Sequence, residues 1–156
     1  MPGFYYEELE PGRVYRHPYT RTITEMDNVL FTSLTMNLQP LHLDAEFAKT
    51  SIHGRPLVNS LFTVALIGGF VGTDLTFGTT AGNLGYEKVE FPNPVFHGDT
   101  LRGETTVTRK RESNSRPDMG IVWMEHRGYN QKDELVMRCE RAGLMLKKPA
   151  EAPESA

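Results

Sequence analysis

The side chain best suited to proton transfer in this sequence is His42, in the segment Asn37-Leu-Gln-Pro-Leu-His42-Leu-Asp44. Histidine changes its protonation state near neutral pH, so a positioned imidazole can act as a general acid or base. Asn37 stands where a proton-transfer site would be expected to carry a carboxylate, and an amide can orient water but cannot take its proton. The segment predicts acid/base chemistry at His42; an exposed histidine on a surface loop is the alternative.

A second candidate site lies at the N-terminus of a predicted long apolar helix, in Val58-Asn59-Ser60, whose polar residues are Asn59 and Ser60. The first amide N–H groups of a helix have no partner within it, and the helix dipole adds positive potential there. Such an end can hold a carbonyl oxygen on which negative charge develops. Both residues are also good helix caps, so capping alone is the alternative reading.

A third candidate is a cluster of cations, Arg109-Lys110-Arg111 followed by Arg116, which could bind phosphate groups. Glu112 and Asp118 flank the cluster, so a solvated strand end is an equal alternative. His97 lies in a predicted turn between strands and could line a cleft.

Several functions are not expected from this composition. The net charge of −3 does not favour nucleic acid or an anionic membrane. The histidines and the single cysteine, Cys139, lack metal-ligand spacing, so we predict no metal site. Cys139 has no adjacent base and is expected to be an inert, half-buried thiol. The apolar run from Leu57 to Val71 is too short and too polar to span a bilayer, and no leader is evident, so we expect a cytoplasmic protein.

The first half of the chain is predicted to position His42 between helices. A strand over residues 13–23 precedes Thr24, which is expected to cap a helix ending near Asn37. Asp44 is expected to cap a short helix over residues 45–49, which leaves His42 on an irregular segment. The side of the first helix that faces the core is expected to carry Met26, Val29, Leu30, Ser33 and Leu34.

The second half is predicted to contain one buried helix and then a run of strands. The helix opens at Leu57 or Val58, is apolar on nearly every face and ends near residues 72–74. Long strands are expected at residues 79–91, 100–111, 120–129 and 135–147. This pattern predicts an α+β fold whose antiparallel sheet wraps the helix, in one domain over residues 1–148 with a disordered tail over 149–156. Dimerisation is a way to cover the sheet edges.

Taken together, these segments resemble the MaoC-like dehydratases, which include the (R)-specific enoyl-CoA hydratases of the hotdog fold. The family pattern of aspartate, Asn-Pro turn, and histidine followed by a hydrophobic residue and aspartate is matched here by Asn37, Gln39-Pro40, His42 and Leu43-Asp44. Arg55-Pro56-Leu57-Val58 is similar to the family's Arg-Pro-Ile-Val segment, and residues 94–101 are similar to its Pro-Val-x-x-Gly-Asp-Thr turn. The likeness runs from about Glu25 to Thr100, with weaker agreement to Leu146.

The resemblance implies a homodimer, or an assembly of dimers, that binds an acyl-CoA substrate at the subunit interface and needs no other cofactor. It implies that His42 adds water to a 2-enoyl thioester, or removes it from a 3-hydroxyacyl thioester, while the Ser60 amide holds the thioester oxygen. The expected substrate-binding residues are Asn59, Arg55, His97, Arg109, Lys110 and Arg116.

The family's aspartate is replaced here by Asn37, and this difference keeps other functions open. A carboxylate on the substrate could assist in its place, so a branched or dicarboxylic acyl group is one possibility. A non-catalytic acyl-CoA-binding protein that has lost the aspartate is a second hypothesis, and a thioesterase is a third.

Overall fold

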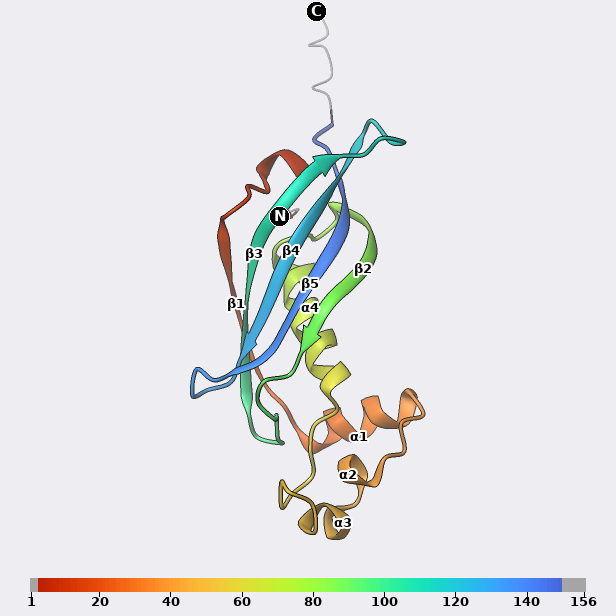
Figure 1. Cartoon of the computed structure of the whole chain (residues 1–156), viewed down its shortest axis with the longest axis vertical. Helices are drawn as coiled ribbons and strands as arrows, with labels where there is room; N and C mark the ends of the chain where they lie inside the picture. Colours follow the sequence, from red (N-terminus) through yellow and green to blue (C-terminus); the bar gives the residue numbers. More distant parts are fainter. Residues whose placement is uncertain (1–2, 150–156) are drawn as a thin grey trace, which may run out of the picture.

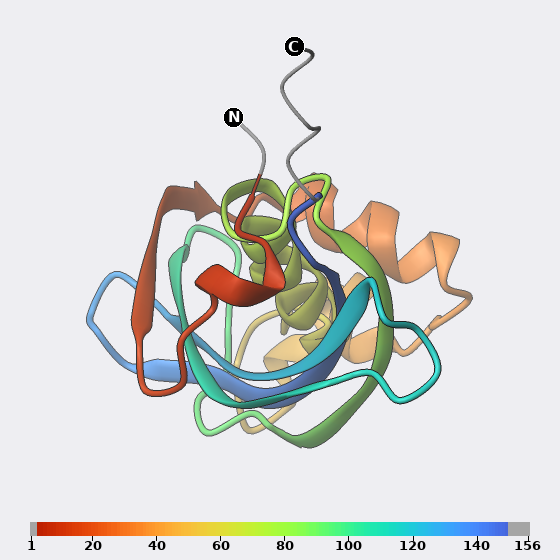
Figure 2. The same cartoon turned by 90° about the horizontal axis from the view of Figure 1, so that it is seen from above.

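The computed structural model describes residues 3–149 and confirms the predicted α+β architecture (Figure 1). One antiparallel sheet has the strand order β1-β3-β4-β5-β2, and it curves around α4 (Figure 2). Apart from Pro149, the tail predicted at the C-terminus lies outside the described residues. The strands are β1 (Val14–Thr22), β2 (Thr80–Glu90), β3 (Thr100–Glu112), β4 (Met119–Tyr129) and β5 (Leu135–Leu146).

The three predicted helices are present in the predicted order, with η1 and α2 in addition. In chain order, the helices of the described residues are η1 (Tyr6–Glu8, a 3-10 turn), α1 (Glu25–Leu34), α2 (Pro40–Leu43), α3 (Ala45–Lys49) and α4 (Ser60–Asp74). Thr24 caps α1 in a reciprocal capping box with Asp27, and Asp44 caps α3. Among residues 3–149, no helix is long and apolar enough to cross a membrane.

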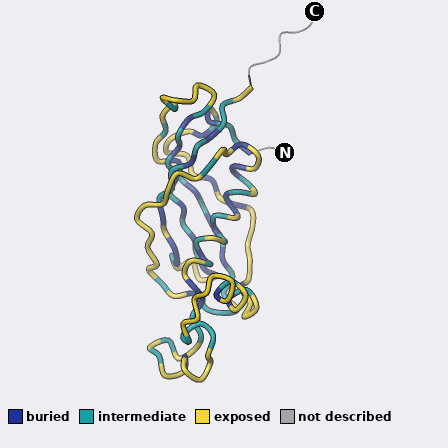
Figure 3. The backbone as a smooth tube through the Cα atoms, turned by 90° about the vertical axis from the view of Figure 1, so that its right-hand side faces the viewer, coloured by how far each residue is buried: buried dark blue, intermediate teal, exposed yellow. Residues whose placement is uncertain are grey.

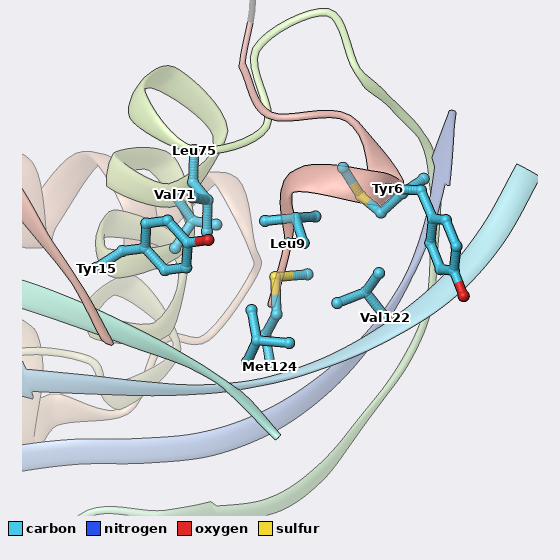
Figure 4. Close-up of a cluster of buried hydrophobic side chains, with 9 residues drawn as sticks. Tyr6, Leu9, Tyr15, Val71, Leu75, Val122 and Met124 are labelled. Carbon is cyan, nitrogen blue, oxygen red and sulfur yellow. The ribbon is translucent and has the colours of Figure 1, made fainter. Parts of the chain in front are cut away.

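The core lies between α4 and the concave face of the sheet. Around the C-terminal half of α4, Val71 and Leu75 pack with Leu9, Val122 and Met124 (Figure 4). Complete burial of a side chain of this size contributes about 1.5–3 kcal/mol. A second cluster surrounds the N-terminal half of α4 and comprises Ile23, Val58, Ile67, Phe70, Val95, Leu101, Val136, Met137 and Cys139.

The prediction for the buried side of α1 was wrong. Met26 and Leu34 are 72% and 75% exposed, whereas Asn28 and Thr32 are completely buried. The reason is that α1 does not lie on the sheet: α1, α2 and α3 form an extension beyond its end, where most residues are exposed or half-buried (Figures 1 and 3). The buried side of α1 therefore faces backbone polar groups near the start of α4, which need hydrogen-bond partners.

The expectation that α4, apolar on nearly every face, is a buried helix was also wrong for one of its flanks in a single chain. Thr63, Ile67, Phe70 and Val71 are its buried residues, whereas Leu61 is 59% exposed. One flank of this apolar helix therefore remains open to solvent in the isolated chain.

Candidate active site

His42 lies on the single-turn helix α2, not on the irregular segment that was predicted. Pro40 occupies the first turn of α2, where its fixed φ suits a helix and its missing N–H costs nothing. The Nδ1 atom of His42 is 2.7 Å from the backbone oxygen of Leu57. Because a carbonyl oxygen only accepts hydrogen bonds, Nδ1 carries the hydrogen, and the neutral imidazole has its lone pair on Nε2.

The buried amide of Asn28 ties this histidine to the start of α4. Its Nδ2 donates to the backbone oxygens of His42 and Leu57, at 3.3 and 3.2 Å, and to Nε2 of His97 at 3.0 Å. Its Oδ1 accepts from the backbone N–H of Asn59 at 2.9 Å. Two amide hydrogens serve three acceptors, so at least one of these bonds is shared. Asn28 therefore fixes three segments that are far apart in the sequence.

Sequence reasoning missed Asn28 because it assigned the buried side of α1 to apolar residues. The available signal was the pair Asn28 and Thr32, two small polar residues spaced by one helical turn. The hydroxyl of Thr32 donates to Oδ1 of Asn28 at 3.5 Å, so the pair forms one buried polar side.

The N-terminus of α4 presents unpaired polar groups beside a cavity. Asn59 caps the helix, because its Oδ1 accepts from the backbone N–H of Leu61 at 3.0 Å. The amide of Ser60 has no acceptor among residues 3–149. Two buried atoms, Nδ2 of Asn59 and Oγ1 of Thr63, also lack a partner in this part of the chain. Such groups need an acceptor or donor from water or a ligand.

The adjoining cavity has a volume of about 280 Å³. Ser60 and Thr63 of α4 line one side, and Phe91 and Val136 line it from the ends of β2 and β5. His53 lies on its wall as well. The wall combines apolar side chains with a few polar groups, which is typical of a small-molecule site.

Asn37 lies in the turn after α1 and is exposed. Its backbone N–H donates to the oxygen of Thr32 at 3.0 Å, and its Oδ1 accepts from the backbone N–H of Gln39 at 3.4 Å. The side-chain NH₂ is therefore free to contact water. That Asn37 positions a catalytic water stays a prediction.

Two predicted substrate-binding residues lie near this site with different roles. The guanidinium carbon of Arg55 is 3.7 Å from the ring centre of Phe96, and Arg55 lines a small polar cavity together with Lys132. His97 is half-buried, and its Nε2 accepts a hydrogen bond from Asn28. His97 therefore contacts the residue that holds His42 in place, and this nitrogen is already occupied by that bond.

The cationic cluster lies at the opposite end of the sheet from α1, α2 and α3, where β3 turns into β4 (Figure 1). The guanidinium carbon of Arg109 stacks 3.9 Å from the ring centre of Trp123. Lys110 donates to the backbone oxygens of Tyr6 and Glu7. Arg116 is exposed in the turn between the two strands. The structure does not bring these cations to His42 within one chain.

The remaining reactive side chain, Cys139, is buried on β5. Burial raises the pKa of its thiol to about 11, which keeps it protonated and unreactive at neutral pH. Within residues 3–149, no group of three or more histidine, cysteine, aspartate or glutamate side chains could hold a metal ion.

Comparison with known proteins identifies the family. The MaoC like domain matches residues 7–126. The chain is 32% identical over 154 residues to the mesaconyl-CoA hydratase of Cereibacter sphaeroides, which is 99% of this chain but 44% of that protein. It is 38% identical over 134 residues to the (R)-specific enoyl-CoA hydratase of Aeromonas caviae, covering 86% of this chain and 93% of that protein. The chain thus spans less than half the length of the first relative and nearly all of the second.

Among solved structures, a Mycobacterium tuberculosis protein with a double hotdog fold superposes with a TM-score of 0.85 at 22% identity. The superposition covers 97% of this chain and 46% of that one. At this identity the likeness concerns the fold alone, and it confirms the hotdog fold. The match to the family over most of the chain shows that this protein belongs to the MaoC-like dehydratase family.

Proposed function

We propose that this chain hydrates 2-enoyl-CoA thioesters, or catalyses the reverse dehydration of 3-hydroxyacyl-CoA. The observation that carries the proposal is the hydrogen bond from His42 Nδ1 to the Leu57 oxygen, because it leaves Nε2 as a proton acceptor. The unpaired Ser60 amide beside the cavity supports the proposal, since it can stabilise a developing enolate.

In the proposed reaction, Nε2 of His42 takes a proton from water while the water oxygen bonds to C3 of the enoyl group. The electron pair of the C2–C3 double bond moves toward the thioester oxygen, which accepts a hydrogen bond from the Ser60 amide. The imidazolium then gives the proton to C2, which yields the 3-hydroxyacyl thioester and a neutral His42. Asn37 orients the water.

Loss of enoyl absorbance over a panel of enoyl-CoA thioesters tests this proposal. His42→Ala should lower kcat by about 10²–10⁴-fold, the usual contribution of a positioned acid/base group. His53→Ala is the matched comparison, because His53 lines the cavity but makes no bond to Leu57, whereas His42 makes that bond and is not among the residues that line the cavity. Unchanged hydration of every thioester by His42→Ala would refute the mechanism, and a larger loss in His53→Ala would move the base to that residue.

A second candidate function, non-catalytic binding of acyl-CoA, is favoured by the exposed amide at Asn37. Asn37→Asp separates the two functions. A site adapted to asparagine should keep or lose activity when the carboxylate is introduced. A large gain would mark a binding protein whose catalytic site has decayed.

The names of the relatives suggest two classes of acyl group for the substrate of this chain. The similarity to a mesaconyl-CoA hydratase favours a branched dicarboxylic acyl group, and the similarity to an (R)-specific enoyl-CoA hydratase favours a simple enoyl group. For the CoA phosphates, Arg55 is better placed than the Arg109 cluster, because it precedes α4 and lies near Lys132.

We also propose that two copies of the chain pair through β2. This strand is a sheet edge, and its Leu84 and Val89 are 54% and 40% exposed, so a second sheet could continue across it. Light scattering on a sizing column should show a dimer that Leu84→Lys with Val89→Lys dissociates. Val14→Lys, on the opposite edge strand, is the control and should remain dimeric. Dissociation by the control alone would place the interface at β1.

A further inference from the structure

The guanidinium of Arg141 on β5 is partly buried, and two of its nitrogens have no partner among the described residues. Its Nε and Nη2 atoms are both buried, and neither has a hydrogen-bond acceptor among residues 3–149. No carboxylate in that range forms an ion pair with it, although the exposed Arg138 on the same strand pairs with Glu125. Arginine is rarely buried without a paired anion, because desolvating a charge is costly. Two buried N–H groups without an acceptor can bind an anion from outside the described residues.

The strand register shows that Arg141 points toward α4. Cross-strand partners in an antiparallel sheet lie on the same face, and Arg141 is paired with Met124 on β4 and Tyr86 on β2. Met124 is completely buried in the core. The hydroxyl of Tyr86 reaches α4 and lies 3.8 Å from the place that a Cβ atom would occupy on Gly68. Arg141 therefore belongs to the inner face of the sheet, opposite the middle of the helix.

The three elements that line the cavity are α4, β2 and β5, and further along they carry Gly68, Tyr86 and Arg141. The cavity begins at Ser60 on α4 and at the ends of β2 and β5. Gly68 lies eight residues further along α4, which is about 12 Å at the helical rise of 1.5 Å per residue. A Cβ atom added to Gly72, one turn beyond Gly68, would meet nothing within 4 Å. To reach the guanidinium from Ser60, an acyl chain must run along this side of α4.

The neighbours of Arg141 do not neutralise its charge. His126 is 1% exposed, and its Nδ1 is hydrogen-bonded to the hydroxyl of Thr105 at 2.9 Å. Burial and the charge of Arg141 lower the pKa of His126 to about 3, so this imidazole is neutral. Its Nε2 is also unpartnered within the described chain. The thiol of Cys139 is protonated as well, so both groups leave the guanidinium as the dominant local charge.

We propose that Arg141 binds a carboxylate at the far end of the acyl group, and thus selects dicarboxylyl-CoA thioesters over neutral ones of equal length. This inference rests on the proposed function, because the acyl group must enter from the Ser60 end. A bidentate pair between a guanidinium and a carboxylate satisfies two N–H groups at once, which matches the two enclosed nitrogens.

Calorimetric binding of matched thioesters to the full chain tests the inference. The pairs are succinyl-CoA with butyryl-CoA and adipyl-CoA with hexanoyl-CoA, which differ in the terminal carboxylate. In Arg141→Met, binding of one or both dicarboxylyl thioesters should weaken by about 10- to 100-fold, while the neutral partners bind as before or more tightly. Arg141→Lys should weaken binding of the dicarboxylyl thioesters less than Arg141→Met does, because lysine keeps the positive charge but cannot form the bidentate pair of hydrogen bonds. Arg138→Met, on the exposed face of the same strand, should change nothing.

Hydration of fumaryl-CoA and crotonyl-CoA separates this inference from the proposed function. If both are hydrated and Arg141→Met leaves the ratio of their kcat/KM values and all four affinities unchanged, the inference fails and the proposed function stands. If neither is hydrated but Arg141 still governs carboxylate binding, hydration fails and the inference stands. Equal weakening of neutral and dicarboxylic thioesters, or dissociation of the dimer by Arg141→Met, would assign Arg141 a structural role instead.

Discussion

Acid should destabilise this protein through one buried side chain, His126. The residue lies in a chain of hydrogen bonds from Asp74 through His17 and Thr105, each 2.9 Å long. Burial, with smaller contributions from the charges of Arg141 and His17, lowers the pKa of His126 to about 3. Protonating it in the folded state would place a second charge near that of Arg141.

The sign and size of the effect follow from the pKa difference between the folded and unfolded chains. An unfolded histidine takes up its proton near pH ~6.5, so between about pH 6.5 and about pH 3 the unfolded state binds more protons. The free energy of unfolding therefore falls as the pH drops through that window, by up to ~1.4 kcal/mol per pH unit. From about pH 7 to pH 5 the loss from His126 alone is roughly 2 kcal/mol.

Urea unfolding followed by tryptophan fluorescence at a series of pH values measures this loss. His126→Gln keeps an amide that can bond to Thr105 but cannot titrate. Between about pH 7 and pH 5, the unfolding free energy of this variant should therefore fall by roughly 2 kcal/mol less than that of the wild type. His53→Gln, a replacement outside this network, should retain the wild-type slope. If His126→Gln loses stability toward acid as steeply as the wild type, the assignment of the effect to His126 is wrong.

Three further predictions concern two buried side chains, Asn28 and Cys139, and the helix cap Thr24. Asn28→Leu leaves several buried backbone groups near His42 without partners, so the free energy of unfolding in urea should fall by about 2–5 kcal/mol; a change below 1 kcal/mol would contradict the role of Asn28 as the central tie. Cys139 should react with iodoacetamide much more slowly in the folded protein than in urea, and equal rates would show that its burial is transient. Thr24→Ala should cost about 1 kcal/mol in the same urea assay through loss of the α1 cap, whereas an unchanged midpoint would show that Asp27 holds the helix start without it.

Local signals in the sequence were sufficient for most of the fold. The four long strands were predicted to within a few residues. In β3, β4 and β5 the alternation follows from one face on the core, whereas the edge strand β2 is exposed over almost its whole length. Capping residues located the starts of α1 and α3, since these side chains bond directly to the first turn. The start of α4 was predicted two or three residues too early, because the apolar character of Leu57 and Val58 extends beyond the helix that Asn59 caps.

The residue types of the candidate site could be proposed from the sequence, but the contacts between them could not. His42 and Ser60 were predicted from their types and from the family pattern, and their catalytic roles stay predictions. The bond from His42 to Leu57 depends on a contact between distant segments. Asn28 was missed because the apolar residues Met26, Val29 and Leu30 on the same helix outweighed its pairing with Thr32 at helical spacing. The cations at Arg109 were grouped with the site because they are close to one another in sequence, whereas the length of β3 carries them to the other end of the sheet.

The supports of His42 make Asn37→Asp a test of chemistry rather than of architecture. Asn28 fixes the backbone on both sides of the hydrogen bond from His42 to Leu57, and none of these bonds involves the side chain of Asn37. A carboxylate introduced at this exposed position can therefore change proton transfer without disturbing the orientation of the imidazole. If activity then rises steeply, the missing base was the limiting factor. If activity stays level, Nε2 of His42 already transfers the proton without a second base at position 37.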